Sequence, residues 1–139
     1  MRNYFYFCLV FIVFSGCISS QAKDSIINHE EMGIIETIPA EEFKNNLDTQ
    51  EYVLIDIRTK EEFLSGKIEG AENIDYYKTM EFNNVLKSLD KNKKYLLYCR
   101  SGARSAAALS LAKTMGFKEI YDLGGGIISW NLSGFNIVQ

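Results

Sequence analysis

Two short apolar runs constrain the fold of this chain more than any other feature of its sequence. They read YVLIDI at 52–57 and KYLLYC at 94–99. Neither run alternates apolar with polar residues, as a strand with one face in water would. Near-continuous apolar runs of this length are typical of strands in a parallel sheet that helices cover on both faces. The two runs therefore predict the centre of an α/β fold.

Shorter segments around these runs continue the alternation of strand and helix. Three further strands are predicted at 34–38, 71–74 and 119–123, and helices at 40–47, 59–66, 79–89, 104–115 and 127–132. Pro39 is expected at the first position of its helix, Thr59 and Glu62 have the spacing of a capping box, and Thr79 is expected to cap the third helix. The 139 residues suit one domain. We therefore predict an α/β domain with a mostly parallel, five-stranded sheet flanked by helices.

The N-terminal residues differ from the rest of the chain. An apolar run, YFYFCLVFIVF at 4–14, follows Arg2 and is followed by the small residues at 15–16. This order is that of a secretory signal peptide, and the run is shorter than the ~20 residues that a membrane-spanning helix needs. We expect a signal peptide at 1–16; an uncleaved anchor is the alternative.

The residue after this segment is Cys17. The segment FSGC at 14–17 resembles the lipobox of bacterial lipoproteins, which implies cleavage before Cys17 and a lipid on that cysteine. Acyl chains would anchor the chain to a membrane without spanning it. We expect a lipid-tethered linker at 17–33, the folded domain at 34–139 and a location in the cell envelope, facing the periplasm or the cell surface. An ordinary signal peptide, without lipid on Cys17, is the alternative.

Composition excludes several classes of function. The formal net charge is −3, so there is no basic excess to neutralise a phosphate backbone and no nucleic acid partner is expected. One histidine and three cysteines are too few for a multi-ligand zinc site or a disulfide framework. Loss of Cys8 with the signal peptide and lipidation of Cys17 would leave Cys99 as the one free thiol. A single free thiol in an exported chain indicates a reactive group or an intermolecular partner.

Cys99 ends the second apolar run, at the sheet edge where sites of α/β proteins lie. It opens a segment that reads Cys99, Arg100, Ser101, Gly102, Ala103, Arg104 and Ser105. The small residues let the backbone turn tightly and point its amides inward, and the predicted helix adds its N-terminus, so the turn favours an anion. Two arginines add positive charge. These effects favour thiolate over thiol and make Cys99 a candidate nucleophile; the alternative is a buried strand cysteine before an ordinary turn.

Four residues separate Cys99 from Arg104, one fewer than in the loop of cysteine phosphatases. The segment resembles the active-site loop of the rhodanese family of sulfurtransferases. DIRTKEEF at 56–63 and GKIEGAENI at 66–74 look like the first motif of that family, although Lys67 stands where histidine is frequent. DLGGG at 122–126, followed by Trp130, looks like its closing motif. The resemblance covers about residues 34–139 and implies a three-layer domain.

The resemblance also implies a reaction. The Cys99 thiolate would attack the outer sulfur of a small anionic donor such as thiosulfate, and the resulting persulfide would pass its sulfur to cyanide, a thiol or an acceptor protein. The loop from Arg100 to Ser105 would hold the persulfide, and no metal or organic cofactor is needed. One alternative is a persulfide carrier or binding module that works with a dedicated protein partner. Another is a thiol redox or phosphatase-like enzyme.

Asp56 and Arg58 lie at the end of the first apolar run, at the same predicted sheet edge as Cys99. They could brace the catalytic loop from behind. The interpretation we favour is structural, a buried ion pair that Arg58 forms with Glu62. Gly124–Gly126 are expected to supply unusual backbone angles after the last strand, with direct contact with the substrate as the alternative. Trp130 is expected to pack in the core or on the surface.

Overall fold

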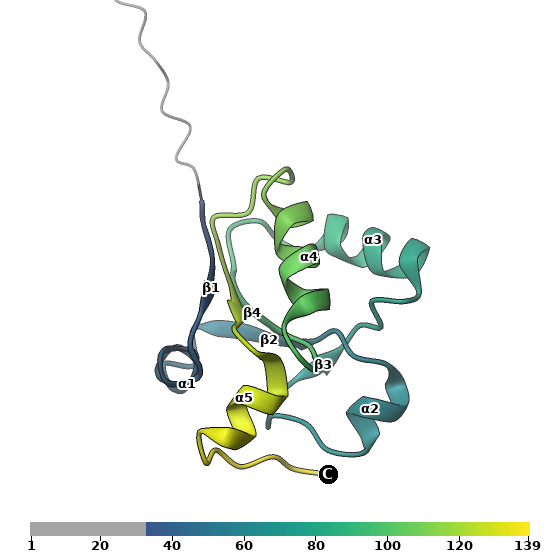
Figure 1. Ribbon diagram of the computed structural model, residues 1–139. Helices are drawn as coiled ribbons and strands as arrows, with labels where there is room; N and C mark the ends of the chain where they lie inside the picture. Colours follow the sequence, from purple (N-terminus) through teal and green to yellow (C-terminus); the bar gives the residue numbers. More distant parts are fainter. Residues whose placement is uncertain (1–32) are drawn as a thin grey trace, which may run out of the picture.

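Strands and helices alternate along residues 33–139, which are the residues that the computed structural model describes (Figure 1). In chain order they are β1 (Ile34–Ile38), α1 (Ala40–Asp48), β2 (Tyr52–Asp56), α2 (Lys60–Leu64), β3 (Glu72–Asn73), α3 (Thr79–Ser88), β4 (Lys94–Tyr98), α4 (Ala103–Ala112), β5 (Glu119–Leu123) and α5 (Gly126–Leu132). The predicted signal peptide, the lipobox and Cys17 lie outside the described residues.

The strands form one sheet in the order β1-β5-β4-β2-β3. Every neighbouring pair is parallel, which confirms the predicted parallel five-stranded sheet. The two long apolar runs become β2 and β4, which are adjacent and lie inside the sheet. Because the strands are parallel, the segments that follow β2, β4 and β5 meet at one edge.

Two cores, one on each face of the sheet, make the domain three-layered. Helices α3 and α4 cover one face, and α1 and α5 cover the other (Figure 1). Side chains alternate between the faces along β4: Leu97 and Cys99 belong to the core under α3 and α4, whereas Leu96 and Tyr98 belong to the other. This alternation directs Cys99 toward α4.

Several helix ends differ from the predicted positions by a few residues. Pro39 and Lys78 are the N-caps of α1 and α3, so Pro39 is not the first helical residue and Thr79 is not the cap. The reason is that their carbonyls accept the first helical hydrogen bonds, from Phe43 at 2.9 Å and Phe82 at 2.8 Å. Helix α4 ends at Ala112, whereas the predicted helix extended to residue 115. The chain continues after Ala112 in tighter turns.

The predicted capping box is confirmed at the start of α2. The Thr59 amide donates to the Glu62 carboxylate at 3.0 Å, and the Glu62 amide donates to the Thr59 hydroxyl at 3.3 Å. These bonds supply partners for amides that a helix start leaves free, and they fix the Glu62 carboxylate at the sheet edge that carries Cys99. Between residues 33 and 139, no helix has both the length and the apolar character needed to cross a bilayer.

Candidate active site

The Cys99 thiol lies one residue beyond the end of β4 and is buried. Two hydrogen-bond donors reach its sulfur: the Gly102 amide lies 3.2 Å from Sγ, and the Ser105 hydroxyl lies 3.4 Å from it. Both donors come from the turn into α4 or from its first helical turn. A sulfur that accepts two hydrogen bonds at a helix N-terminus is placed to carry negative charge.

Gly102 lets the chain turn so tightly that its amide faces the sulfur. It is the N-cap of α4 and adopts a left-handed conformation, with φ of 90°. A Cβ atom at this position would lie 3.0 Å from the Gly125 nitrogen, so a side chain would be both strained and crowded. The turn thus depends on glycine for its shape and for its contact with α5.

Helix α5 closes the loop from the other side. The amides of Ile127 and Ile128 donate to the carbonyls of Cys99 and Arg100, at 2.9 and 3.2 Å. Gly126 makes this approach possible, because a Cβ atom there would lie 2.5 Å from the Cys99 carbonyl oxygen. Unusual backbone angles occur at Gly125 and Gly126, whose φ values are 75° and 61°, but Gly124 is not among the residues with positive φ.

Arg104 is held by a two-point ion pair. Its guanidinium donates to both oxygens of Glu62, at 2.8 and 2.9 Å, and lies over the ring of Tyr77. The hydrogen bonds from Arg104 lower the pKa of Glu62 to about 2, assisted by the Thr59 amide and opposed by burial. The Arg104 charge is therefore largely compensated within the protein.

The rest of the predicted loop faces solvent. Arg100, Ser101 and Ala103 are exposed, whereas Ser105 is buried. Arg100 forms no ion pair with any residue of the 33–139 range. Of the two arginines in the loop, Arg100 is thus the one whose charge is available to an incoming anion.

The expected ion pair between Arg58 and Glu62 is not formed. Arg58 instead pairs with the buried Asp56, with Nη2 and Oδ2 2.6 Å apart, and donates to the Gly66 carbonyl at 2.7 Å. Arg58 pairs with Asp56 because Asp56 is only two residues away, at the end of β2. The carboxylate of Glu62 is already paired with Arg104. The Arg58 guanidinium lies over the ring of Tyr98. The Asp56–Arg58 pair therefore packs against the residue that directly precedes Cys99.

Lys67 and Trp130 belong to the scaffold. The Lys67 amide and carbonyl both bond to Val138 at 2.8 Å, and the Lys67 ammonium lies over the ring of Phe63. Trp130 is buried in the core on the α1 side and donates through Nε1 to the Asn136 carbonyl at 2.9 Å. The segment after α5 is thereby fastened to the rest of the domain.

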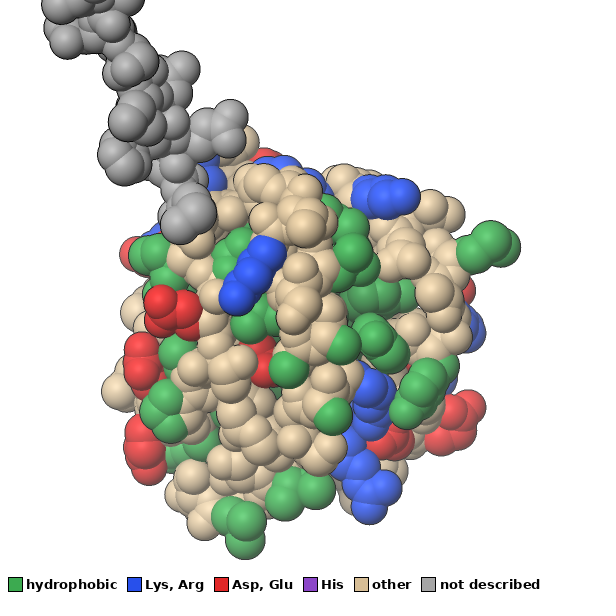
Figure 2. All heavy atoms as spheres, turned by 45° about the horizontal axis from the view of Figure 1, so that its top comes forward, with side chains coloured by type: hydrophobic (Ala, Val, Ile, Leu, Met, Phe, Trp, Pro, Cys, Tyr) green, Lys and Arg blue, Asp and Glu red, His purple; other side chains and the backbone are tan. Residues whose placement is uncertain are grey.

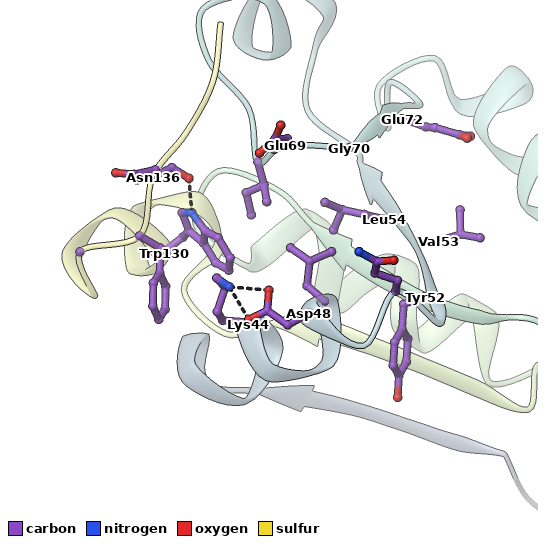
Figure 3. A pocket seen from close by; sticks show the side chains of 15 residues that line it. Lys44, Asp48, Tyr52, Val53, Leu54, Glu69, Gly70, Glu72, Trp130 and Asn136 are labelled. Carbon is purple, nitrogen blue, oxygen red and sulfur yellow. Dashed lines mark hydrogen bonds and ion pairs between the residues drawn. The ribbon is translucent and has the colours of Figure 1, made fainter.

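A groove of about 740 Å³ lies away from the cysteine loop. Figure 3 shows it between α1, the start of β2, the turn before β3 and the segment after α5, with the Lys44–Asp48 ion pair and Trp130 on its walls. None of residues 99–105 lines it. The structure thus separates this groove from the thiol chemistry.

Asp122, a residue of the predicted closing motif, is buried opposite Leu97, on the sheet face that also carries Cys99. Its Oδ2 accepts a hydrogen bond from Thr37 at 3.2 Å, and its Oδ1 is buried with no partner among the described residues. Burial raises the pKa of Asp122 to about 6, and the neighbouring hydroxyls of Thr37 and Ser105 oppose that effect. The sequence analysis assigned no function to Asp122. The signal that could have singled it out is a charged residue inside a predicted buried strand, EIYDL at 119–123.

The fold and this thiol define a class: an α/β protein with a cysteine thiol, held by two hydrogen-bond donors, at the carboxyl end of a parallel strand. No group of three side chains suited to a metal ion lies within residues 33–139. Residues 39–133 match the family model of the rhodanese-like domain, and the chain belongs to the rhodanese family.

Two relatives illustrate the range of proteins that this domain occurs in. A sulfurtransferase of Allochromatium vinosum is 33% identical over 107 residues, which are 76% of this chain and 96% of the relative. A tRNA uridine(34) hydroxylase of Cytophaga hutchinsonii is 34% identical over 93 residues, which are 66% of this chain and 30% of the relative. The chain thus spans about a third of the length of the hydroxylases that it matches.

Solved structures confirm the fold. A rhodanese-related protein from Thermoplasma volcanium superposes with a TM-score of 0.64 at 32% identity, over 74% of this chain and 97% of that chain. A rhodanese-like domain protein from Staphylococcus aureus gives a TM-score of 0.62 at 28% identity, over 75% and 99%. Together with the sequence relatives, these matches support a sulfur-transfer or persulfide-related role.

Proposed function

We propose that the chain is an exported sulfurtransferase that moves sulfane sulfur through a persulfide on Cys99. The donor is a small sulfur-containing anion such as thiosulfate, and the acceptor is cyanide, a thiol or a protein thiol. The observation that carries the proposal is the pair of donors on a buried nucleophile, with the Gly102 amide 3.2 Å and the Ser105 hydroxyl 3.4 Å from Sγ.

The first half-reaction makes a sulfur–sulfur bond and breaks another. The Cys99 thiolate attacks the outer sulfur of thiosulfate, and the electron pair of the donor's S–S bond leaves with sulfite. The total charge of the reactants, a thiolate and a dianion, equals that of the products, a persulfide anion and sulfite dianion. The donors that face Sγ and the N-terminus of α4 are placed to stabilise the negative sulfur in both states.

The second half-reaction removes the outer sulfur from the Cys99 persulfide. An acceptor nucleophile attacks the outer sulfur of the persulfide, the S–S bond breaks, and its electron pair returns to Sγ as thiolate. Arg100 supports the approach of anionic donors from solvent, because it is exposed and without an ion-pair partner in the described part of the chain. No external oxidant or reductant enters this cycle.

Export and anchoring are proposed from the N-terminal sequence. The support is the order Arg2, the apolar run at 4–14 and the small residues before Cys17. Expression in a bacterium with lipoprotein processing tests this part. We expect the mature chain to begin at Cys17 with added acyl mass and to sediment with membranes, and we expect Cys17→Ser to lose both properties.

A nucleic acid substrate is not proposed, although some relatives are named as tRNA hydroxylases. The formal net charge of −3 gives no general attraction to phosphates. Figure 2 shows one face of the domain, where acidic side chains follow one another down the left side and Lys and Arg side chains are scattered over the top, the middle and the right. This mixed face lacks the broad basic surface that a tRNA partner would favour.

The test is thiosulfate:cyanide sulfurtransferase turnover, measured beside intact mass. We expect turnover and the mass increment of one sulfur atom in the unmodified sequence, and neither in Cys99→Ser. Ser110→Ala is the matched control, because Ser110 is exposed on α4, outside the loop, and its hydroxyl donates only to the Ala106 carbonyl. Turnover that persists in Cys99→Ser would contradict the proposal.

A persulfide carrier is the second candidate. The complete burial of Cys99 favours it, because an acceptor reaches the sulfur only after the loop opens, and a docked partner protein can stabilise the open loop. The same experiment separates the two functions: a sulfur increment on Cys99 without turnover indicates a carrier that requires a dedicated protein acceptor.

A further inference from the structure

The end of the domain opposite Cys99 carries a group of exposed lysines. Figure 1 shows this end at the top, formed by the start of β1, the turn between α3 and β4, and the segment between α4 and β5. Because β4 extends over five residues at ~3.3 Å each, this end lies ~17 Å from the cysteine loop. We call its exposed lysines the lysine cluster: Lys87, Lys93, Lys113 and Lys118.

Local contacts hold the segments that carry the lysine cluster together. The Lys118 amide donates to the Lys91 carbonyl at 3.1 Å, which joins the segment before β5 to the turn after α3. The Lys91 ammonium lies 3.8 Å from the centroid of the Phe117 ring and donates to the Lys87 carbonyl at 3.1 Å. Lys113 is the C-cap of α4, on the same short connection as Lys118. The cluster is therefore one surface built from three neighbouring segments.

The carboxylates at this end do not neutralise the lysine cluster. None of its four lysines forms an ion pair with a residue of the described range 33–139. Glu51 and Glu119 are paired with Lys94, at 3.0 and 3.5 Å, and Asp48 is paired within α1. Asp90, in the turn between α3 and β4, is the carboxylate that remains. In a chain with a formal net charge of −3, this end is thus positive.

The polypeptide enters the domain at this same end. A Cβ atom on Gly33 would lie 1.9 Å from the Phe117 carbonyl oxygen, and the Ile34 amide donates to the Lys118 carbonyl at 2.8 Å. Sixteen peptide bonds join Cys17 to Gly33, so a lipid on Cys17 would lie at most ~60 Å from this entry point. A tether of that length keeps the lysine cluster at high effective concentration near the bilayer.

Two exposed apolar side chains accompany the lysines. Ile34 is 49% exposed at the start of β1, and Leu111 is 37% exposed in the last turn of α4. Lysines around exposed apolar groups are typical of surfaces that lie in the headgroup region of a membrane, where the apolar groups reach the acyl boundary and the ammonium groups meet phosphates. Each lysine close to an anionic surface strengthens binding about fivefold.

We propose that the lysine cluster docks the domain onto a bilayer of anionic lipids, with the cysteine loop facing away from it. The inference rests on the proposed function only in the anchoring of the chain at Cys17, and it requires no sulfur chemistry. In this orientation the exposed Arg100 faces soluble donors and acceptor proteins. The headgroup charge, which would repel an anionic donor, lies more than one Debye length from the loop.

The test is a lysine footprint of the full chain on vesicles. One set consists of phosphatidylcholine, and the other of equal parts of phosphatidylcholine and phosphatidylglycerol. A water-soluble acylating reagent is added, and modified lysines are counted by peptide mass spectrometry. We expect acylation of the lysine cluster to be about fivefold lower on the anionic vesicles than on the neutral ones, and this protection to disappear at high salt.

The footprint contains its own control. Lys60 and Lys78 are also exposed but follow the carboxyl ends of β2 and β3, and we expect them to react equally on both kinds of vesicle. Because the apolar run at 4–14 can bring the chain to either kind, the ratio between lysines is the readout and total binding is not. Equal acylation of the lysine cluster on both vesicles, or protection of Lys60 and Lys78 instead, would overturn the inference.

Two double variants with the same change of charge test the position of the lysines. Lys113→Gln combined with Lys118→Gln should lower the preference for anionic over neutral vesicles, measured by flotation, about tenfold or more. Lys60→Gln combined with Lys78→Gln should change it less than about twofold. An equal fall in both double variants would mean that net charge alone matters, and the inference would be wrong.

Two further measurements separate this inference from other readings. Protection of the lysine cluster by tRNA but not by anionic vesicles would overturn it in favour of a nucleic acid partner. Sulfurtransferase turnover of the same samples keeps the two proposals apart: turnover without a footprint rejects the docking alone, and a footprint without turnover rejects the sulfur chemistry alone. Lipidation of Cys17 is detected by the mass of the mature chain, so its absence does not imitate a failed footprint.

Discussion

Arg104 and Glu62 join α4 to α2 across 42 positions of sequence through two parallel hydrogen bonds. The same carboxylate also accepts the Thr59 amide. One residue thus caps a helix and fixes the loop that carries Cys99. The pairing also uses up one of the two positive charges of that loop, so the attraction of anions depends on Arg100.

Neutralising Glu62 should weaken the domain without removing the cap. Glu62→Gln keeps a side chain that suits the capping box but loses the charge that pairs with Arg104, and we expect a loss of ~1–2 kcal/mol in the free energy of unfolding at pH 7. The pKa of Glu62 is lowered to about 2, so its stabilisation is present above its unfolded pKa and is lost as pH falls toward 2. Denaturant unfolding at neutral and acidic pH measures both effects. Glu61→Gln, an exposed neighbour, is the control; an equal loss in the two variants would contradict the prediction.

Arg100 should govern the binding of the donor rather than the chemical step. Arg100→Gln removes an exposed charge, which is worth ~1 kcal/mol or about fivefold in the KM for thiosulfate, with kcat little changed. The effect should shrink at high salt. Steady-state kinetics at two ionic strengths test this. Arg104→Gln should instead lower the free energy of unfolding. An unchanged KM in Arg100→Gln would contradict the prediction and show that another group attracts the donor.

Asp122→Asn should stabilise the protein in a pH-dependent manner. The pKa of Asp122 is raised to about 6 by burial, so the folded state is penalised when pH rises through that value, whereas both states are protonated well below the ordinary pKa of an aspartate. The isosteric asparagine avoids the penalty, and we expect a gain of ~2–3 kcal/mol above pH 7 that disappears near pH 4. Urea unfolding across this range measures the gain. A difference that does not change with pH would assign the gain to packing.

Gly126 should tolerate no side chain. In Gly126→Ala the new methyl group would lie 2.5 Å from the Cys99 carbonyl oxygen, and we expect a loss of ~3 kcal/mol or more because backbone has to move. Gly116→Ala is the matched control, since Gly116 also has positive φ, of 76°, but has open space around it; its cost should be ~1–2 kcal/mol. Thermal unfolding and the rate at which Cys99 reacts with a disulfide reagent measure the two variants. Equal losses would mean that strain at φ, rather than the contact with the loop, sets the cost.

Local patterns predicted most of the fold. The apolar runs gave β2 and β4 almost to the residue, and the spacing of Thr59 and Glu62 gave a capping box that the structure contains. Such features depend on residues a few positions apart. Helix ends were less accurate, because the cap is decided by which carbonyl accepts the first bond, as Lys78 shows.

Partners far apart in sequence could not be predicted in this way. The pairing of Glu62 with Arg104 depends on how α2 and α4 meet, and without it Glu62 was assigned to Arg58. Asp122 was visible as part of a motif, but its burial beside Ser105 depends on the register of β5 with β4. The roles of the loop residues from Arg100 to Ser105 stay predictions until the kinetic experiments are done.

The pairing of β1 with β5 has a consequence for how the chain is made. β1 is the first strand of the domain to leave the ribosome, and its partner is the last, since Thr37 lies opposite Asp122, 85 positions later. The sheet cannot close before synthesis is nearly complete, and contacts so distant in sequence form slowly. During translation the growing polypeptide therefore lacks its closed sheet until β5 has been made, and Cys99 is accessible to chaperones and oxidants in that interval.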